Sequence, residues 1–224
     1  MPIRSAVVMA SLLCAAAQIA AGQSLDAFLQ GLDQSSKNFS GAKATIHRTT
    51  HTRGIDDDDV ESGDFLVKRD HDRSQIRIDF KDPNVYSVVL NDRQAEVYRP
   101  KLNETTDYDL RAYHDVAEKL FLLGFGMTGR ELAANYEIAK LKKDAVDGDP
   151  CTYVELTPKS PDVAKKLKTI DVWISDRTKC PARQIFHMPD GSWNKAEFAA
   201  MDTSVKLADK VFDLPRGAKH VKGN

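Results

Sequence analysis

The side chains of this 224-residue chain that could bind a metal or transfer a proton are six histidines and 33 acidic residues. His47 and His51 are four residues apart, a spacing that places two zinc ligands on one face of a helix. Their segment, residues 42–52, is rich in β-branched side chains and predicts a strand, in which the two imidazoles would lie about 13 Å apart. No HExxH, CxxC or other metal-spaced motif occurs, so we predict no metal site.

The acidic residues are plentiful but show no catalytic arrangement. The run Asp56 to Asp59 lacks the alternating oxygen ligands and the turn glycine of a calcium-binding EF-hand loop, and it predicts a solvated hairpin tip. The stretch Gly124 to Gly129 matches GxGxxG in letters, but it follows an apolar run and not a strand, which argues against a nucleotide site. Since no GxSxG elbow, P-loop or distinct carboxylate pair occurs either, we predict a protein that is not an enzyme and needs no cofactor.

The first 22 residues have the pattern of a secretory signal. Arg4 supplies the positive charge, residues 6–17 are apolar, and Ala20-Ala21-Gly22 offers the small side chains of a cleavage site. We predict cleavage near Gly22, a single domain over residues 23–224 and a location in the periplasm. The formal net charge of −1 gives no electrostatic reason to expect nucleic-acid binding.

The cysteines of an exported chain raise the question of a disulfide. Cys151 begins a predicted strand and Cys180 follows the far end of its antiparallel neighbour, so we expect both thiols at one rim of the sheet and predict a bond between them. Two buried free thiols are the alternative. Cys14 follows the large residue Leu13, which disfavours a lipidated cysteine without excluding one.

The hydrophobic pattern predicts a helix, then a long series of strands. Residues 24–38 place Leu25, Phe28, Leu29 and Leu32 on one helical face. Residues 108–123 also have helical spacing, and Thr128 with Glu131 matches a capping box that opens a short helix. Apolar and polar residues alternate, as in strands, over residues 42–52, 63–69, 74–80, 86–90, 94–98, 136–141, 151–157, 170–175, 182–188 and 193–201, with a short closing edge at 211–215.

An apolar run at residues 120–127, LFLLGFGM, interrupts this alternation. Eight residues are too few to span a bilayer, and two glycines break the run. We interpret it as a movable lid over an apolar cavity, with an ordinary buried piece of core as the alternative. The predicted lid residues are Leu120, Phe121, Leu122, Leu123 and Phe125.

These elements predict a mainly β (α+β) fold: a strongly curved antiparallel sheet that forms an incomplete β-barrel and is covered by helices acting as a lid. A sheet of about ten strands encloses more interior than its own side chains fill, so a hydrophobic ligand cavity becomes plausible. Its predicted lining residues are Phe65, Val67, Ile76, Ile78, Phe80, Val88, Leu90, Val154, Leu156, Ile170, Val172 and Ile174.

Four segments, taken in order, resemble the LolA-type outer-membrane lipoprotein carrier family. They are SGDFLVKR at 62–69, LTPK at 156–159, DVWIS at 171–175 and VFDLPRG at 211–217. The resemblance implies a half-barrel whose cavity takes the acyl chains of lipoproteins or other lipids across the periplasm. It also implies that the arginine ending the first segment, here Arg69, hydrogen-bonds the lid and gates it.

The resemblance further implies two partners, an inner-membrane export complex and an outer-membrane acceptor, and we expect the protein to be a monomer. Leu66 stands where the carriers have a tryptophan, and the cavity is poor in aromatic residues, which favours another amphiphile such as a free lipid or a glycolipid. The alternative function is a periplasmic sensor that binds a signalling partner on the same scaffold, as the family's sigma-factor regulators do. Those regulators usually carry a second C-terminal domain, and this sequence ends soon after Pro215, which favours carriage.

Overall fold

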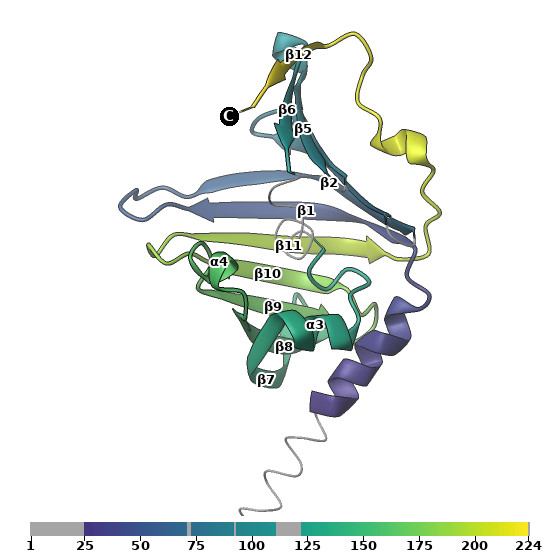
Figure 1. Cartoon of the computed structure of the whole chain (residues 1–224), viewed down its shortest axis with the longest axis vertical. Helices are drawn as coiled ribbons and strands as arrows, with labels where there is room; N and C mark the ends of the chain where they lie inside the picture. The colour runs from purple at the N-terminus through teal and green to yellow at the C-terminus, as the bar shows by residue number, and fades with distance from the viewer. Residues whose placement is uncertain (1–24, 71–72, 92, 111–121, 224) are drawn as a thin grey trace, which may run out of the picture.

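The computed structural model describes residues 25–70, 73–91, 93–110 and 122–223. Within these ranges, twelve strands form one continuous sheet in the order β12-β6-β5-β4-β3-β2-β1-β11-β10-β9-β8-β7 (Figure 1). The strands are β1 (Gly41–His51), β2 (Asp59–Asp70), β3 (Arg73–Asp82), β4 (Tyr86–Leu90), β5 (Gln94–Arg99), β6 (Glu104–Asp109), β7 (Tyr136–Val146), β8 (Asp149–Pro158), β9 (Thr169–Ser175), β10 (Pro181–His187), β11 (Trp193–Asp202) and β12 (Lys219–Lys222).

The sheet consists of two antiparallel meanders joined in the middle. β1 pairs with β2 on one side and with β11 on the other, so the first strand of the chain lies at the centre of the sheet. β5, β6 and β12 run steeply across the direction of β1 and β11 (Figure 1). The two edges, β7 and β12, do not pair with each other. The predicted strongly curved and open sheet is therefore confirmed.

The closing edge differs from the prediction. Residues 211–215 do not form a strand, because the 3-10 helix η3 (Asp209–Phe212) occupies this part of the chain and buries Phe212. The last strand is instead β12, which pairs in parallel with β6. A parallel partner needs a crossing connection and leaves no hairpin signal in the sequence, so this strand was not predicted.

The predicted helix over residues 108–123 is also wrong at its start. Tyr108 belongs to β6, which pairs in register with β5 and contains the β-branched residues Thr105 and Thr106. Strand pairing overrides the helical spacing of a few apolar residues there. A second 3-10 helix, η1 (Pro100–Leu102), connects β5 to β6. Residues 111–121 lie outside the described ranges.

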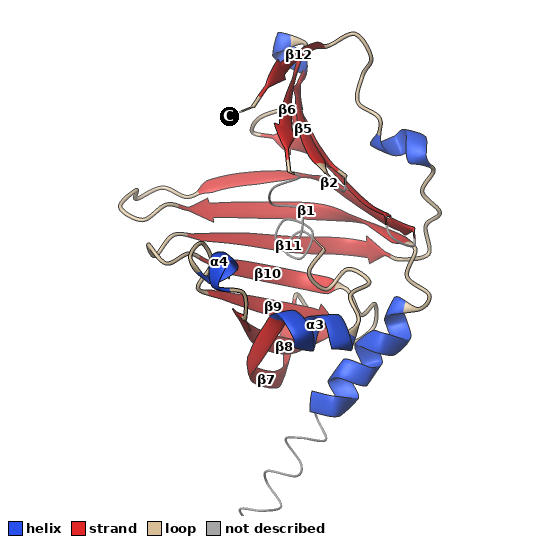
Figure 2. Ribbon diagram, in the orientation of Figure 1, coloured by secondary structure: helices blue, strands red, loops and turns tan. Residues whose placement is uncertain are grey.

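The α-helices gather over the β7–β9 end of the sheet (Figure 2). Residues 25–36 are helical, and the two further α-helices of the described chain are α3 (Gly129–Asn135) and α4 (Pro161–Ala164). The predicted capping box is confirmed, since the Thr128 hydroxyl accepts from the Glu131 amide and the Glu131 carboxylate accepts from the Thr128 amide. Within the described ranges, no helix combines the length and the apolar character needed to cross a membrane.

The buried side chains form two main clusters on the concave face. The first lies under the helices and joins Leu32, Leu132 and Val163 to the inward residues of β8 and β9. The second lies between β1, β2, β3 and β11 and contains Ile46, Phe65 and Phe198, among others. Residues 122–127 contribute side chains to both clusters.

Candidate functional site

The 122–127 segment fills the concave face of the sheet. Leu123 and Phe125 are each only 1% exposed. Leu122 and Phe125 pack in the β1–β3 cluster, whereas Leu123 and Met127 pack under the helices. The Phe125 ring lies 5.0 Å from that of Phe65 and makes an edge contact with Phe198, the geometry that aromatic pairs prefer. This segment, which we call the plug, therefore links the two halves of the core.

Two glycines give the plug its path. Gly124 and Gly126 have φ angles of +80° and +65°, a region that side chains with a Cβ rarely adopt. A Cβ at Gly124 would lie 2.7 Å from Pro181, and one at Gly126 would lie 2.4 Å from the Phe39 ring. The glycines are thus required both for the turn and for the close packing.

Two side chains from different strands hold the plug by its backbone carbonyls. Arg69, at the end of β2, donates from Nη1 to the Gly126 oxygen at 2.5 Å. Gln184, buried on β10, donates from Nε2 to the Leu123 oxygen at 2.7 Å. The sequence predicted that Arg69 bonds the lid, but it did not single out Gln184. One feature of the sequence could have indicated Gln184: it is a polar residue at an inward strand position, between Ala182 and Phe186.

Glu131 supports the arginine from α3. Its carboxylate accepts from Arg69 at 3.2 Å and from the Thr128 amide at 2.7 Å. Burial opposes ionisation of this carboxyl, but the hydrogen bonds from Thr128 and the charge of Arg69 outweigh burial, so its pKa is lowered. The carboxylate is therefore ionised near neutral pH and fixes the guanidinium beside the plug.

The predicted cavity residues line the face on which the plug lies. Those of β2, β3 and β4 are in the cluster around Phe125, and those of β8 and β9 are in the cluster around Leu123. The apolar space between the plug, Leu32 and the β8–β9 wall holds only about 10 Å³. The prediction of a roomy cavity is therefore wrong at this position, because the side chains of the plug fill the space. The predicted lid residues Leu120 and Phe121 lie outside the described ranges.

Phe80 is the exception among the predicted cavity residues. It is buried, but it belongs to neither cluster and stacks on Tyr86 with ring centroids 4.7 Å apart. The Arg48 guanidinium also lies over the Phe80 ring, 4.6 Å from its centroid. Phe80 therefore packs beside Arg48 and Tyr86, in a different and more polar environment on the same face.

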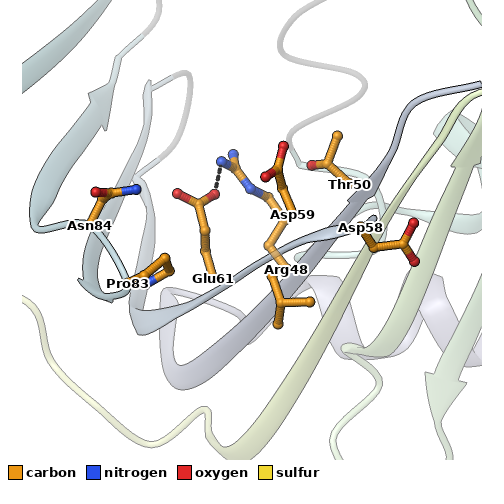
Figure 3. A pocket seen from close by; sticks show the side chains of 8 residues that line it. Arg48, Thr50, Asp58, Asp59, Glu61, Pro83 and Asn84 are labelled. Carbon is orange, nitrogen blue, oxygen red and sulfur yellow. Dashed lines mark hydrogen bonds and ion pairs between the residues drawn. The ribbon is translucent and has the colours of Figure 1, made fainter. Parts of the chain in front are cut away.

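This polar environment is a pocket of about 660 Å³ at the β1–β2 hairpin end (Figure 3). Side chains alternate between the two faces of a strand, so Ala44, Ile46, Arg48 and Thr50 share the inward face of β1. Towards the hairpin these inward residues change from apolar to polar. The concave face is thus apolar in its middle and polar at this end. The pocket is lined by Arg48, Thr50, Asp58, Asp59, Val60, Glu61, Pro83 and Asn84.

Two of the lining residues, Arg48 and Glu61, form a closed hydrogen-bonded group with Tyr86. Arg48 pairs with Glu61 (Figure 3). Arg48 also donates to the Tyr86 hydroxyl at 2.9 Å, and that hydroxyl donates to Glu61 at 2.8 Å. Burial and the hydrogen bond to Glu61 raise the pKa of Tyr86 to about 12. Arg48 Nε is buried without a partner among the described residues. The sequence did not reveal this group, since its members come from three strands.

The predicted disulfide is wrong: Cys151 and Cys180 are free and buried. Cys151 is the register partner of Ser175 on one side of β9, and the Cys180 carbonyl accepts from the Ser175 amide on the other side. Two strand spacings place the cysteines about 10 Å apart, too far for a disulfide. Burial raises the pKa of Cys180 to about 12, and burial followed by the nearby Asp149 raises the pKa of Cys151.

Several solved structures have a similar fold at low sequence identity. MucB matches with a TM-score of 0.54 at 14% identity, over 87% of this chain and 64% of that chain. This chain shares the fold of the matched part of MucB. An uncharacterised conserved protein from Thermus thermophilus matches with a TM-score of 0.53 at 12% identity, over 87% of this chain and 98% of that chain. The chain spans 61–64% of the length of the MucB chains that it matches.

The predicted resemblance to LolA-type proteins is found among the solved structures as well. A LolA superfamily protein from Nitrosomonas europaea matches with a TM-score of 0.41 at 13% identity, over 85% of this chain and 98% of that chain. No family model and no curated protein matches the sequence. The matches to MucB and to the Thermus thermophilus protein, at 14% and 12% identity, are evidence of a shared fold and not of a shared function.

Proposed function

We propose that this protein is a non-enzymatic periplasmic carrier that binds the acyl chains of a lipoprotein or another lipid on its concave face and moves them towards the outer membrane. The observation that carries the proposal is the plug. An apolar segment with two glycine turns lies on the concave face and is held at two backbone carbonyls by side chains. Such a segment can leave as a unit once those two hydrogen bonds break.

Displacing the plug would exchange one apolar occupant for another. The face beneath it presents Phe65, Val67 and Phe198 from the sheet. Each acyl methylene buried there contributes about 0.8 kcal/mol, so a long chain offsets the lost burial of the plug's four apolar side chains. The plug in this view protects the apolar face from water while the carrier is empty.

The polar pocket gives the bound amphiphile a direction. Glu61 and Arg69 are both inward residues of β2, eight positions or about 26 Å apart. We infer that the polar group of the ligand lies at the Arg48 pocket and that its chains run along β2 towards the plug and Arg69. An export complex in the inner membrane and an acceptor in the outer membrane are the partners proposed from the LolA resemblance.

Arg69→Leu tests the proposal. Losing a charge-assisted hydrogen bond costs on the order of 1.5–3 kcal/mol, which destabilises the plugged form and leaves the ligand-bound form with less competition. We therefore expect roughly tenfold or greater tightening for a fluorescent fatty acid, together with slower release to vesicles. Fluorescence titration and stopped-flow transfer from the loaded protein measure the two effects.

Arg183→Leu is the matched control. Arg183 pairs with Glu197 and stacks on Trp173 outside the two concave clusters, so its loss should leave fatty-acid binding unchanged. Wild-type affinity and release rate in Arg69→Leu would contradict gating by the plug. Absence of fatty-acid binding in every form of the protein, with no lipid copurifying from cell envelopes, would overturn the carrier function.

A second candidate is a sensor that binds a signalling protein. The match to MucB favours it, since MucB has been solved in complex with MucA. Native mass spectrometry of the protein purified from cell envelopes separates the two candidates. A copurifying lipid supports carriage, and a copurifying protein supports sensing.

A further inference from the structure

Three neighbouring strands bring Glu96, Asp107 and His220 together at the β12 edge of the sheet. Glu96 on β5 and Asp107 on β6 are direct register partners, and His220 lies on β12, which pairs with β6. One ligand atom from each residue falls within 4.8 Å of the other two. His220 is 113 residues from Asp107 in sequence, which explains why linear spacing predicted no metal site.

The charges of this group are unbalanced without a cation. His220 Nδ1 lies 2.9 Å from an Asp107 oxygen, so these two side chains satisfy each other. Glu96 is half-buried directly opposite Asp107 and has no hydrogen-bond partner among the described residues. Like charges placed directly opposite in a sheet are destabilising.

We propose that Glu96, Asp107 and His220 form a Zn²⁺ site. One imidazole nitrogen and two carboxylate oxygens are ligands that zinc accepts in tetrahedral geometry, with water as the fourth ligand. The imidazole favours zinc over calcium and magnesium, which select oxygen ligands. Zinc neutralises both carboxylates and replaces the hydrogen bond between His220 and Asp107.

The ion would fasten the last strand to the sheet. β12 has only four residues and pairs with β6 alone, so it is a short edge strand with one neighbour. A metal ligated from β5, β6 and β12 ties this edge across three strands. Zinc binding should therefore raise the thermal stability of the folded chain as its concentration exceeds the dissociation constant.

Isothermal titration of the whole mature protein with ZnCl₂, paired with thermal melts, tests the site. We expect one equivalent to bind with a dissociation constant on the order of micromolar, weaker than that of four-ligand structural sites. Glu96→Gln should weaken binding at least about tenfold while it keeps the pair of His220 with Asp107. His220→Gln should abolish binding and the rise in melting temperature.

His187→Gln is the matched control, because His187 also pairs with one carboxylate, Asp171 at 2.8 Å, but has no second carboxylate beside it in the described structure. The His187→Gln variant should bind zinc with the same affinity as the wild type. Equal zinc affinity in Glu96→Gln and wild type would overturn the site, since an adventitious histidine would explain it. Failure of the wild-type protein to bind zinc would overturn it as well.

Discussion

At the scale of single residues, the plug depends on two side chains, of which the LolA resemblance indicated Arg69 and no sequence pattern indicated Gln184. Arg69 on β2 and Gln184 on β10 reach it from opposite arms of the sheet, and each donates to one backbone carbonyl. A buried carbonyl left without its donor costs about 1–3 kcal/mol. In the carrier proposal, this cost helps to keep the plug closed until a bound ligand offsets it.

The two cysteines lead to a prediction at the same scale. Both thiols are buried and their pKa values are raised, so neither is a reactive thiolate near neutral pH. In the native protein we expect no reaction with Ellman's reagent over minutes. In denaturant without reductant, we expect both Cys151 and Cys180 to react. A thiol count of zero under denaturing conditions would mean that the disulfide exists after all.

At the scale of elements, the junction between α3 and the 25–36 helix sets how the helices cover the sheet. Gly129 begins α3, and a Cβ there would lie 2.3 Å from the Leu29 carbonyl oxygen. The backbone of α3 at Gly129 therefore packs directly against the backbone of the 25–36 helix at Leu29, at a distance that only glycine permits. The plug ends at Met127, two residues earlier, so this junction also anchors one end of the plug.

Gly129→Ala should therefore destabilise the protein by about 1–3 kcal/mol, because the backbone of the 25–36 helix must move. Gly31→Ala is the matched control: it lies in the same helix with nothing within 4 Å of an added Cβ, and it should stabilise by up to about 1 kcal/mol. Urea unfolding followed by circular dichroism measures both. A neutral Gly129→Ala would show that the junction is looser than the structure describes.

At the scale of the whole molecule, the sheet and the plug should differ in how they open. The strands of the central sheet are paired on both sides, as β1 is by β2 and β11. The plug has two anchoring hydrogen bonds from side chains and a turn bond from the Phe125 amide to the Leu122 oxygen. Its opening therefore exposes less structure than global unfolding does.

Native-state hydrogen exchange tests this difference. We expect amides of residues 122–127 to exchange through a local opening, several kcal/mol below the free energy that protects β1 and β2. Arg69→Leu should lower the protection of the plug further and leave the central strands unchanged. Plug amides as strongly protected as those of β1 would identify the segment as permanent core and would weaken the carrier proposal.

The local patterns of the sequence determined much of this protein. Alternation along Phe65 and Val67 or Ile76 and Ile78 specified strands and their buried face, and the run around Phe125 marked the segment that breaks the alternation. The capping box at Thr128 is equally local. Each of these features follows from the positions of a few consecutive residues, because side-chain periodicity depends only on the local backbone.

Tertiary structure decided everything that depends on which strands are neighbours. It separated Cys151 from Cys180 by placing β9 between them, and it brought Gln184 to the plug. It also assembled the Arg48 pocket and the triad that includes His220. Register and strand order come from pairing and packing across the whole chain, and a one-residue change of register would reverse which side chains face each other. No local pattern contains that information.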